Sequence, residues 1–316
     1  MRTTISAEKL VRQFDGLTAV DGVDLEIQQG EIYGFLGPNG AGKSTTVRML
    51  CTLLAPTSGR AVVAGHDVAT NPGQVRLAIG VALQEAALDP KQTGVELLRL
   101  QGRLYGLSKA EIDQRLADLA MLVDIGDALD RRIATYSGGM KRRLDLAAAL
   151  VHNPEVLFLD EPTTGLDPEV RAEMWQEIEA LAAEQGVTVL LTTHYMEEAD
   201  RLAARLAIVD RGRIVAAGTP DELKRELRGD AVHIELGATA NGNARSALDR
   251  VEGVREIVLE GRSLHARADD GARAVPGVLA ALDANGVPVA SVTVARPSLE
   301  DVYLRHAGRT FEEAAR

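Results

Sequence analysis

The sequence predicts an α/β fold built around a phosphate-binding loop, followed by a small α+β domain. Three observations support this prediction. Residues 31–54 have the pattern of a short apolar strand, a glycine-rich loop and a helix. Residues 156–161 are Val-Leu-Phe-Leu-Asp-Glu, which indicates an apolar strand that ends in two carboxylates. From residue 232 to residue 294 the expected elements follow the order β-α-β-β-α-β.

Length and composition limit the classes of protein to consider. The chain has 316 residues, enough for a large domain and a smaller one with separate cores. Its 46% hydrophobic and 26% charged residues are typical of a globular protein, and no apolar run approaches the roughly 18 residues of a membrane span. A net charge of −11 argues against a dedicated nucleic-acid binder.

The N-terminus and the cysteine count indicate a cytosolic protein. The first residues, Met-Arg-Thr-Thr-Ile-Ser, lack the apolar segment of a secretory signal. Cys51 is the only cysteine, which excludes an intramolecular disulfide and any multi-cysteine metal site. Its position in the apolar periodicity of a predicted helix indicates a packed thiol.

The glycine-rich loop fits the pattern G-x-x-x-x-G-K-[ST]. In a strand–loop–helix arrangement, backbone N–H groups converge on a polyphosphate, and glycines permit its close approach. Lys43 is expected to reach the β- and γ-phosphates, and the Ser44 hydroxyl to coordinate Mg²⁺. A glycine-rich turn with a solvated lysine is the alternative. The expected nucleotide-binding residues here are Gly37, Pro38, Asn39, Gly40, Ala41, Gly42, Lys43, Ser44 and Thr45.

The two carboxylates after the apolar strand complete a nucleotide site. Open α/β sheets place their chemistry at the carboxyl ends of the strands. Asp160 is suited to the Mg²⁺ shell, and Glu161 to polarising the water that attacks the γ-phosphate. In isolation, the same segment would also fit a strand that ends in an acidic turn.

A second anion-binding helix start is expected at Tyr136-Ser-Gly-Gly-Met140. Ser137 is placed to cap the following helix, while Gly138 and Gly139 leave its first N–H groups uncovered. One nucleotide cannot easily use both helix starts within one fold, but two copies facing each other could share two nucleotides. The cluster Lys141-Arg-Arg143 is interpreted as a solvated turn of this helix.

These motifs together resemble the nucleotide-binding subunit of an ATP-binding cassette (ABC) transporter, from about residue 5 to about residue 220. Tyr136-Ser-Gly-Gly-Met140 is similar to the family signature Leu-Ser-Gly-Gly-Gln, from which it departs at both ends. Four further positions match family elements in order. They are Phe14 (adenine stacking), Gln84 (metal sensing and the membrane partner), Gly165-Leu-Asp167 (dimer interface) and His194 (the switch histidine near the γ-phosphate).

The resemblance implies a P-loop cassette at residues 1–228, with a RecA-like core, an antiparallel β subdomain and a helical subdomain at about 90–150. Two helices fit this subdomain by their apolar spacing, the second with a capping box of Ser108 and Glu111. It also implies that two cassettes enclose ATP and Mg²⁺, with Glu161, His194 and Lys43 as catalytic residues. Ser44, Gln84 and Asp160 are the expected metal residues, and Phe14, Ser137, Gly138 and Gly139 join the nucleotide-binding set.

Residues 229–306 are expected to form a ferredoxin-like βαββαβ domain, followed by a tail at 307–316. The expected strands are 232–236, 254–260, 264–268 and 288–294, with helices at 244–251 and 271–285 and a kink at Pro276. This domain contains no cluster of His, Cys or carboxylate residues that would mark an active site. Dimerisation or regulation of the cassette is the expected role.

The closing stretch, Arg296-Pro-Ser-Leu-Glu-Asp-Val-Tyr-Leu304, resembles the daunorubicin/doxorubicin-resistance branch of ABC exporters. In that branch the ATPase and the membrane permease are separate chains. The resemblance implies a peripheral subunit at the cytoplasmic face of the membrane, and export of a hydrophobic drug-like or lipid-like compound.

Other functions of a cassette remain open at this stage. They are a soluble ATPase of translation or DNA repair, the ATPase subunit of an importer, and a non-hydrolysing regulatory cassette. The single phosphate loop, the acidic charge and the absence of a heptad insertion disfavour the first. The terminal domain disfavours the second. The intact Lys43, Asp160, Glu161 and His194 disfavour the third.

Overall fold

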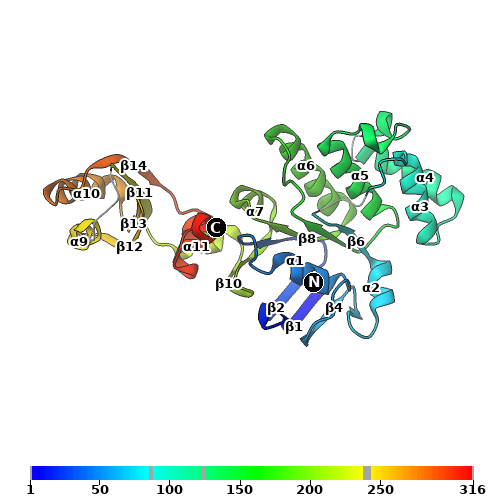
Figure 1. Cartoon of the computed structure of the whole chain (residues 1–316), viewed down its shortest axis with the longest axis horizontal. Coiled ribbons are helices and arrows are strands. Elements are labelled where there is room, and N and C mark those ends of the chain that lie inside the picture. The colour runs from blue at the N-terminus through cyan, green and yellow to red at the C-terminus, as the bar shows by residue number, and fades with distance from the viewer. Residues whose placement is uncertain (1, 85–87, 123–124, 238–242, 315–316) are drawn as a thin grey trace. The chain divides into compact units, whose positions relative to one another are not determined.

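The computed structural model describes residues 2–84, 88–122, 125–237 and 243–314. Contacts divide the chain into two compact units, one as far as Thr219 and the other Pro220–Ala314. Each unit has its own sheets and helices (Figure 1). The last two residues of the expected tail lie outside the described residues.

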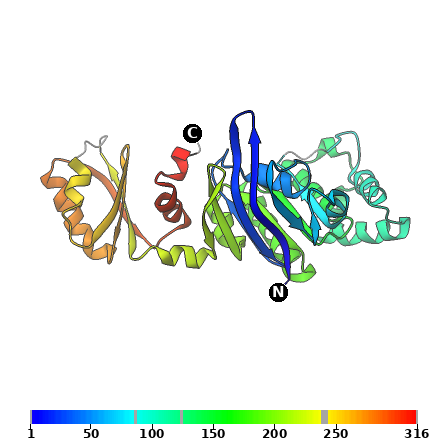
Figure 2. The same ribbon diagram turned by 90° about the horizontal axis from the view of Figure 1, so that it is seen from below.

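An antiparallel sheet opens the first unit, with strand order β2-β1-β4-β5. Its two long strands form the hairpin that is prominent in Figure 2. Asp15 and Gly16 both have positive φ at the hairpin turn, as turns matched to the strand twist require. The strands are β1 (Thr3–Phe14), β2 (Leu17–Gln28), β4 (Ser58–Val63) and β5 (His66–Asp67).

A six-stranded sheet forms the centre of this unit, in the order β10-β9-β3-β8-β7-β6. The pairs from β9 through β6 are parallel, and only β10 runs antiparallel to its neighbour. The carboxyl ends of β3, β7 and β8 therefore lie at one edge. The strands are β3 (Ile32–Leu36), β6 (Ile79–Ala82), β7 (Val156–Asp160), β8 (Thr188–Thr193), β9 (Arg205–Asp210) and β10 (Arg213–Gly218).

Two hydrophobic cores cover the two faces of the central sheet. Alternate residues of β7 enter different cores: Val156 and Phe158 pack with the antiparallel sheet, and Leu157 and Leu159 with the helical part. Such strands are buried on both faces, which explains their continuous apolar sequence. The helices outside the helical part are α1 (Lys43–Leu50), α2 (Pro72–Ala78), α6 (Pro168–Gln185) and α7 (Met196–Leu202).

The helical part contains the two expected helices and the helix after the Ser-Gly-Gly segment. The long helices are α3 (Gly94–Leu104), α4 (Lys109–Leu122) and α5 (Gly138–Leu150), with 3-10 turns η1 (Gly126–Ala128) and η2 (Ile133–Thr135). The Ser108 and Glu111 capping box is confirmed, because each side chain accepts a hydrogen bond from the other residue's backbone N–H. Helix α5 packs against β6 on one side and α3 on the other.

The second unit confirms the βαββαβ order. Its sheet is antiparallel, in the order β12-β13-β11-β14, with α9 and α10 packed on it (Figure 2). Pro276 lies inside α10, and the closing stretch forms the capped helix α11. The elements are α8 (Pro220–Glu226), β11 (Asp230–Leu236), α9 (Asn243–Leu248), β12 (Val254–Glu260), β13 (Ser263–Ala268), α10 (Gly271–Ala284), β14 (Val289–Ala295), α11 (Leu299–Ala307) and α12 (Phe311–Ala314).

Candidate functional site: a phosphate-binding pocket with paired carboxylates

The loop between β3 and α1 has the geometry that its glycines predict. Gly40 and Gly42 have φ of 79° and 102°, in the left-handed region that side chains disfavour. A Cβ at Gly37 would lie 2.4 Å from the carbonyl oxygen of Val209. Helix α1 begins at Lys43, and no side chain caps it. Its first N–H groups can therefore serve an anion.

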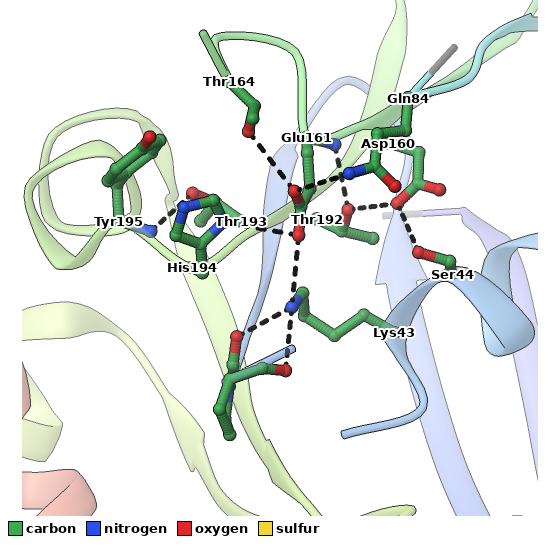
Figure 3. Close-up of polar contacts among 12 residues, drawn as sticks. Lys43, Ser44, Gln84, Asp160, Glu161, Thr164, Thr192, Thr193, His194 and Tyr195 are labelled. Atoms are coloured by element: carbon green, nitrogen blue, oxygen red, sulfur yellow. Dashed lines mark hydrogen bonds and ion pairs between the residues drawn. The ribbon is translucent and has the colours of Figure 1, made fainter. Parts of the chain in front are cut away.

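The Lys43 side chain lies inside this loop and is only 4% exposed. Its Nζ donates hydrogen bonds to the carbonyl oxygens of Gly37 (2.7 Å) and Pro38 (3.0 Å), as Figure 3 shows. The same nitrogen is 3.4 Å from Oε1 of Glu161. Burial lowers the pKa of Lys43, and the nearby Glu161 opposes this shift. The lysine is thus a partly desolvated cation at the bottom of the loop, where a phosphate would gain most from it.

Asp160 joins three segments at the carboxyl edge of the sheet. Its Oδ1 accepts hydrogen bonds from Ser44 Oγ at 3.0 Å and from Thr192 Oγ1 at 2.5 Å (Figure 3). Its Oδ2 is buried with no hydrogen-bond partner in the described structure. The free carboxylate oxygen and the Ser44 hydroxyl are hard oxygen donors of the kind that Mg²⁺ prefers. The residues present therefore fit this ion.

The Glu161 carboxylate contacts side chains that follow two other strands of the central sheet. Its Oε1 is 3.3 Å from Nδ1 of His194, and its Oε2 accepts from Gln84 Nε2 at 3.4 Å. The adjacent His194 ring, together with Lys43, lowers the pKa of Glu161 to about 2, against the effect of burial. Its backbone has a φ of 51°, a strained conformation for a non-glycine residue. The carboxylate is ionised and directed towards the phosphate loop.

A pocket of about 220 Å³ lies between the loop and these carboxylates. The pocket brings together Lys43, Ser44, Gln84 and Glu161 from separate parts of the sequence. No group of three or more His, Cys, Asp or Glu side chains able to hold a metal occurs in the described ranges. A metal here would depend on phosphate oxygens as well. The lining residues are Ala19, Asn39, Gly40, Gly42, Lys43, Ser44, Thr45, Gln84 and Glu161.

The two predicted nucleotide-binding elements outside the phosphate loop, Phe14 and the Ser137–Gly139 segment, do not line this pocket. Phe14 is 39% exposed at the end of β1, and the Arg12 guanidinium lies 4.4 Å from its ring centroid. Ser137 caps α5 by accepting a hydrogen bond from Met140 N at 3.2 Å. Gly138 and Gly139 follow in the first turn of α5. The predicted contact of Phe14 with adenine stays a prediction. So does the predicted contact of Ser137–Gly139 with a nucleotide bound to a second copy.

The structure corrects one interpretation and adds one residue. The Arg143 side chain is only 14% exposed, and Arg142 is also not part of a solvated turn, because its side chain is only 11% exposed. Its position four residues before the buried Leu146, on the apolar stripe of α5, is the signal that could have indicated this. Thr192, at the end of β8, was also missed, although it holds both Asp160 Oδ1 and the backbone N–H of Glu161.

Comparisons with known proteins agree with this geometry. A family model described as "ABC transporter" matches residues 20–164, and "ATP-binding protein DrrA1-3-like, C-terminal domain" matches residues 218–307. The chain is 45% identical to daunorubicin resistance ATP-binding protein DrrA3 of Streptomyces coeruleorubidus, over 99% of both chains. It is 35% identical to linearmycin resistance ATP-binding protein LnrL of Bacillus subtilis, over 98% of this chain and 100% of that protein.

A solved structure gives the same result for the fold. The cbiO1 protein of Clostridium perfringens, part of the ABC transporter complex cbiONQ, superposes with a TM-score of 0.66 at 28% identity. The match covers 72% of this chain and 92% of that one. None of the helices in the described part of the chain combines the length with the apolar composition of a membrane span.

Proposed function

This chain belongs to the ABC transporter ATP-binding proteins, of the drug-resistance exporter type, and on that premise we propose that it energises a separate membrane permease. It binds ATP and hydrolyses it. The observation that supports a hydrolytic site in this chain is the convergence of Lys43, His194 and Gln84 on Glu161 at the phosphate loop. We assign to Glu161 the role of orienting the water that attacks the γ-phosphate.

In the hydrolysis step each polar side chain has a distinct role. Lys43 exchanges its contacts with Gly37, Pro38 and Glu161 for oxygens of the β- and γ-phosphates. Glu161 then accepts a hydrogen bond from water and orients it, while His194 contacts the γ-phosphate. Ser44, Asp160 and Gln84 would hold Mg²⁺, which offsets charge on the phosphates when bound.

The Ser137–Gly139 tip supports a two-copy mechanism. This tip presents uncovered N–H groups at the start of α5 but does not line the chain's own pocket. Two copies arranged head to tail would each place this tip on the nucleotide of the other. ATP binding would then favour association, and hydrolysis would weaken it, because the γ-phosphate between the two copies is cleaved to inorganic phosphate and leaves.

An apolar cleft of about 340 Å³ supports a docking site for the permease. Its lining includes Leu53 and Leu83, which precedes Gln84. Leu53, Leu77, Leu100 and Leu104 are exposed large hydrophobic side chains of α1–α3 and the segments next to them. Exposed apolar groups next to a cleft are typical of a protein interface. A movement of the permease at this cleft would be transmitted to the nucleotide pocket through Gln84, because Leu83 lines the cleft and Gln84 lines the pocket.

The names of the relatives support the class of substrate. One relative is named for daunorubicin resistance and another for linearmycin resistance. We propose export of a hydrophobic drug-like or lipid-like compound, with the chain at the cytoplasmic face of the membrane. The residues that would contact the compound lie on the permease. The β11–β14 domain is assigned to dimerisation or regulation of the cassette.

Glu161→Gln tests the hydrolytic assignment. The variant should bind ATP with nearly unchanged affinity, form a stable ATP-dependent dimer, and lose turnover by about 100-fold or more. The matched control is Glu155→Gln, at an exposed carboxylate just before the same strand, which should hydrolyse ATP normally. Unchanged turnover in Glu161→Gln would refute the role of Glu161.

Purification from membranes tests the transporter assignment separately. The tagged chain should be recovered with an integral membrane protein, whose loss should also release the chain from the membrane. Recovery with ribosomes or DNA and without a membrane protein would instead support the soluble cassette alternative.

A further inference from the structure

Arg142 donates hydrogen bonds to three backbone carbonyl groups, in two segments of the chain around the site. From α5 its Nε donates to the carbonyl oxygen of Pro162 at 2.8 Å, and Nη2 donates to that of Asp160 at 3.0 Å. Its Nη1 donates to the carbonyl oxygen of Leu83 at 2.6 Å. The side chain is largely buried, so water competes little for these hydrogen bonds.

Two of these carbonyl groups flank Glu161 directly. Asp160 precedes it and Pro162 follows it, so the guanidinium holds the main chain on both sides of the strained residue. The backbone N–H of Glu161 is held separately by Thr192, whose carbonyl oxygen and Oγ1 accept at 3.1 and 3.0 Å. A left-handed non-glycine residue persists only where its surroundings fix it. Arg142 and Thr192 provide that restraint.

We propose that Arg142 is a positioning residue for ATP hydrolysis, which holds the main chain around Glu161 so that its carboxylate meets the attacking water. The inference rests on the role proposed above for Glu161. Asp145, three residues further along α5, orients the guanidinium through a contact of 3.3 Å between Oδ2 and Nη1. The third hydrogen bond, to Leu83, extends the same restraint to the backbone next to Gln84.

An arginine is required by this geometry. Its planar fork directs separate N–H groups at carbonyls in different directions, whereas a lysine concentrates three donors on one nitrogen. Arg142→Lys would keep the charge but could not bridge the same carbonyl groups. Arg143, the neighbouring residue, instead pairs with Glu173 and Glu177 of α6. Neither of these two partners lines the pocket, so Arg143 provides a matched control.

The test is ATP hydrolysis by full-length Arg142→Met, Arg142→Lys and Arg143→Met. For Arg142→Met we expect kcat to fall about 100-fold, because a displaced catalytic group loses its alignment, while KM and ATP affinity change less than about threefold. Arg142→Lys should remain at least about tenfold impaired, and it provides the test if the methionine variant does not fold. Arg143→Met should hydrolyse ATP like wild type.

A double variant tests whether Arg142 acts through Glu161. Arg142→Met combined with Glu161→Gln should form the ATP-dependent dimer as readily as Glu161→Gln alone. Loss of that dimer would mean that Arg142 supports dimer formation by the Ser137–Gly139 tip of α5 and does not act through Glu161. This result would overturn the inference. Full activity of Arg142→Lys, or equal losses in the Arg142 and Arg143 variants, would also overturn it. Turnover by Glu161→Gln itself would mark a failure of the proposed function instead.

Discussion

At the scale of single residues, Lys43 connects the phosphate loop to Glu161, the carboxylate that we propose for hydrolysis. It is buried against two carbonyl oxygens and Glu161, although burial disfavours its charge. The phosphates of ATP are stronger partners for this ammonium than neutral carbonyls are. Binding of ATP would therefore move the Lys43 ammonium away from Glu161, and the Glu161 carboxylate could then bind the attacking water.

Lys43→Ala should weaken nucleotide binding itself. The variant loses a charge-assisted contact, which contributes about 1.5–3 kcal/mol, so the ATP dissociation constant should rise by about 10- to 150-fold. Equilibrium binding of a fluorescent ATP analogue measures this. Lys141→Ala removes an exposed lysine from α5 and should leave the affinity unchanged. Equal affinities in the two variants would contradict the placement of Lys43.

A second prediction concerns Asp145, whose pKa burial raises to about 6 although Arg142 opposes the shift. In the unfolded chain this carboxyl ionises near 3.8. Folding therefore favours the protonated form, and its contribution to stability is complete below about pH 4 and lost as pH rises to about 6. The loss is on the order of 3 kcal/mol. Asp145→Asn cannot ionise, but it can still accept a hydrogen bond from Arg142.

Denaturant unfolding at several pH values tests this sign. The unfolding free energy of Asp145→Asn minus that of wild type should increase by roughly 2–3 kcal/mol between pH 4 and pH 6.5, because only the wild type loses stability as this carboxyl ionises. A constant difference across this range would mean that Asp145 is ionised in the folded chain throughout.

At the scale of elements, the start of α5 contains a glycine, Gly138, whose role we expect in the proposed contact with a second copy. A Cβ at Gly138 would meet no atom within 4 Å, and Gly138 has no positive φ. Alanine also has a higher helix propensity than glycine. The glycine therefore has no structural purpose within one free chain. A ligand or partner at the helix tip would explain it.

Gly138→Ala should keep the thermal midpoint and the ATP affinity of the single chain but lower turnover by about tenfold or more, because the methyl group obstructs the opposing phosphate. Gly73→Ala is the matched control, since Gly73 also lies in the first turn of a helix with no atom within 4 Å of its Cβ. Normal turnover in Gly138→Ala would argue against the two-copy arrangement.

Elements that depend on local rules were predictable from sequence, and contacts between distant segments were not. The phosphate loop, the Ser137 cap and the Ser108 capping box follow from short patterns. Arg142 was misjudged because charged residues are usually solvated, and its partner Leu83 is 59 positions away. The Thr192 contact with Asp160 spans 32 positions and depends on the parallel pairing of β7 with β8.

The sequence analysis also missed one helix near the end of the chain. The closing stretch was useful for its family resemblance, but its helix, α11, was not predicted. Ser298 and Asp301 form a capping box there, with hydrogen bonds in both directions between side chain and backbone. The Ser-x-x-Asp spacing was the available signal. Helix α11 packs against α8, so it belongs to the second unit.

At the scale of the whole molecule, the two units have separate cores. The two clusters of the cassette contain residues from Ile5 to Val209, and the cluster of the second unit begins at Val232. The net charge of −11 opposes direct adsorption to an anionic bilayer. Attachment at the membrane should therefore depend on contacts with the permease.

Separate cores predict that residues 1–219 fold without the second unit and bind ATP within about threefold of the full chain's affinity, because none of the pocket residues lies beyond Thr219. Calorimetry and ATP titration of this fragment provide the measurement, with the full chain as control. The second unit should then affect dimerisation or the hydrolysis rate in the permease complex, not the affinity of one chain for nucleotide. An unfolded fragment, or one that has lost ATP binding, would show that the β11–β14 domain completes the cassette's structure. A fragment that binds ATP and also dimerises and hydrolyses it with the permease like the full chain would leave that domain without the assigned role.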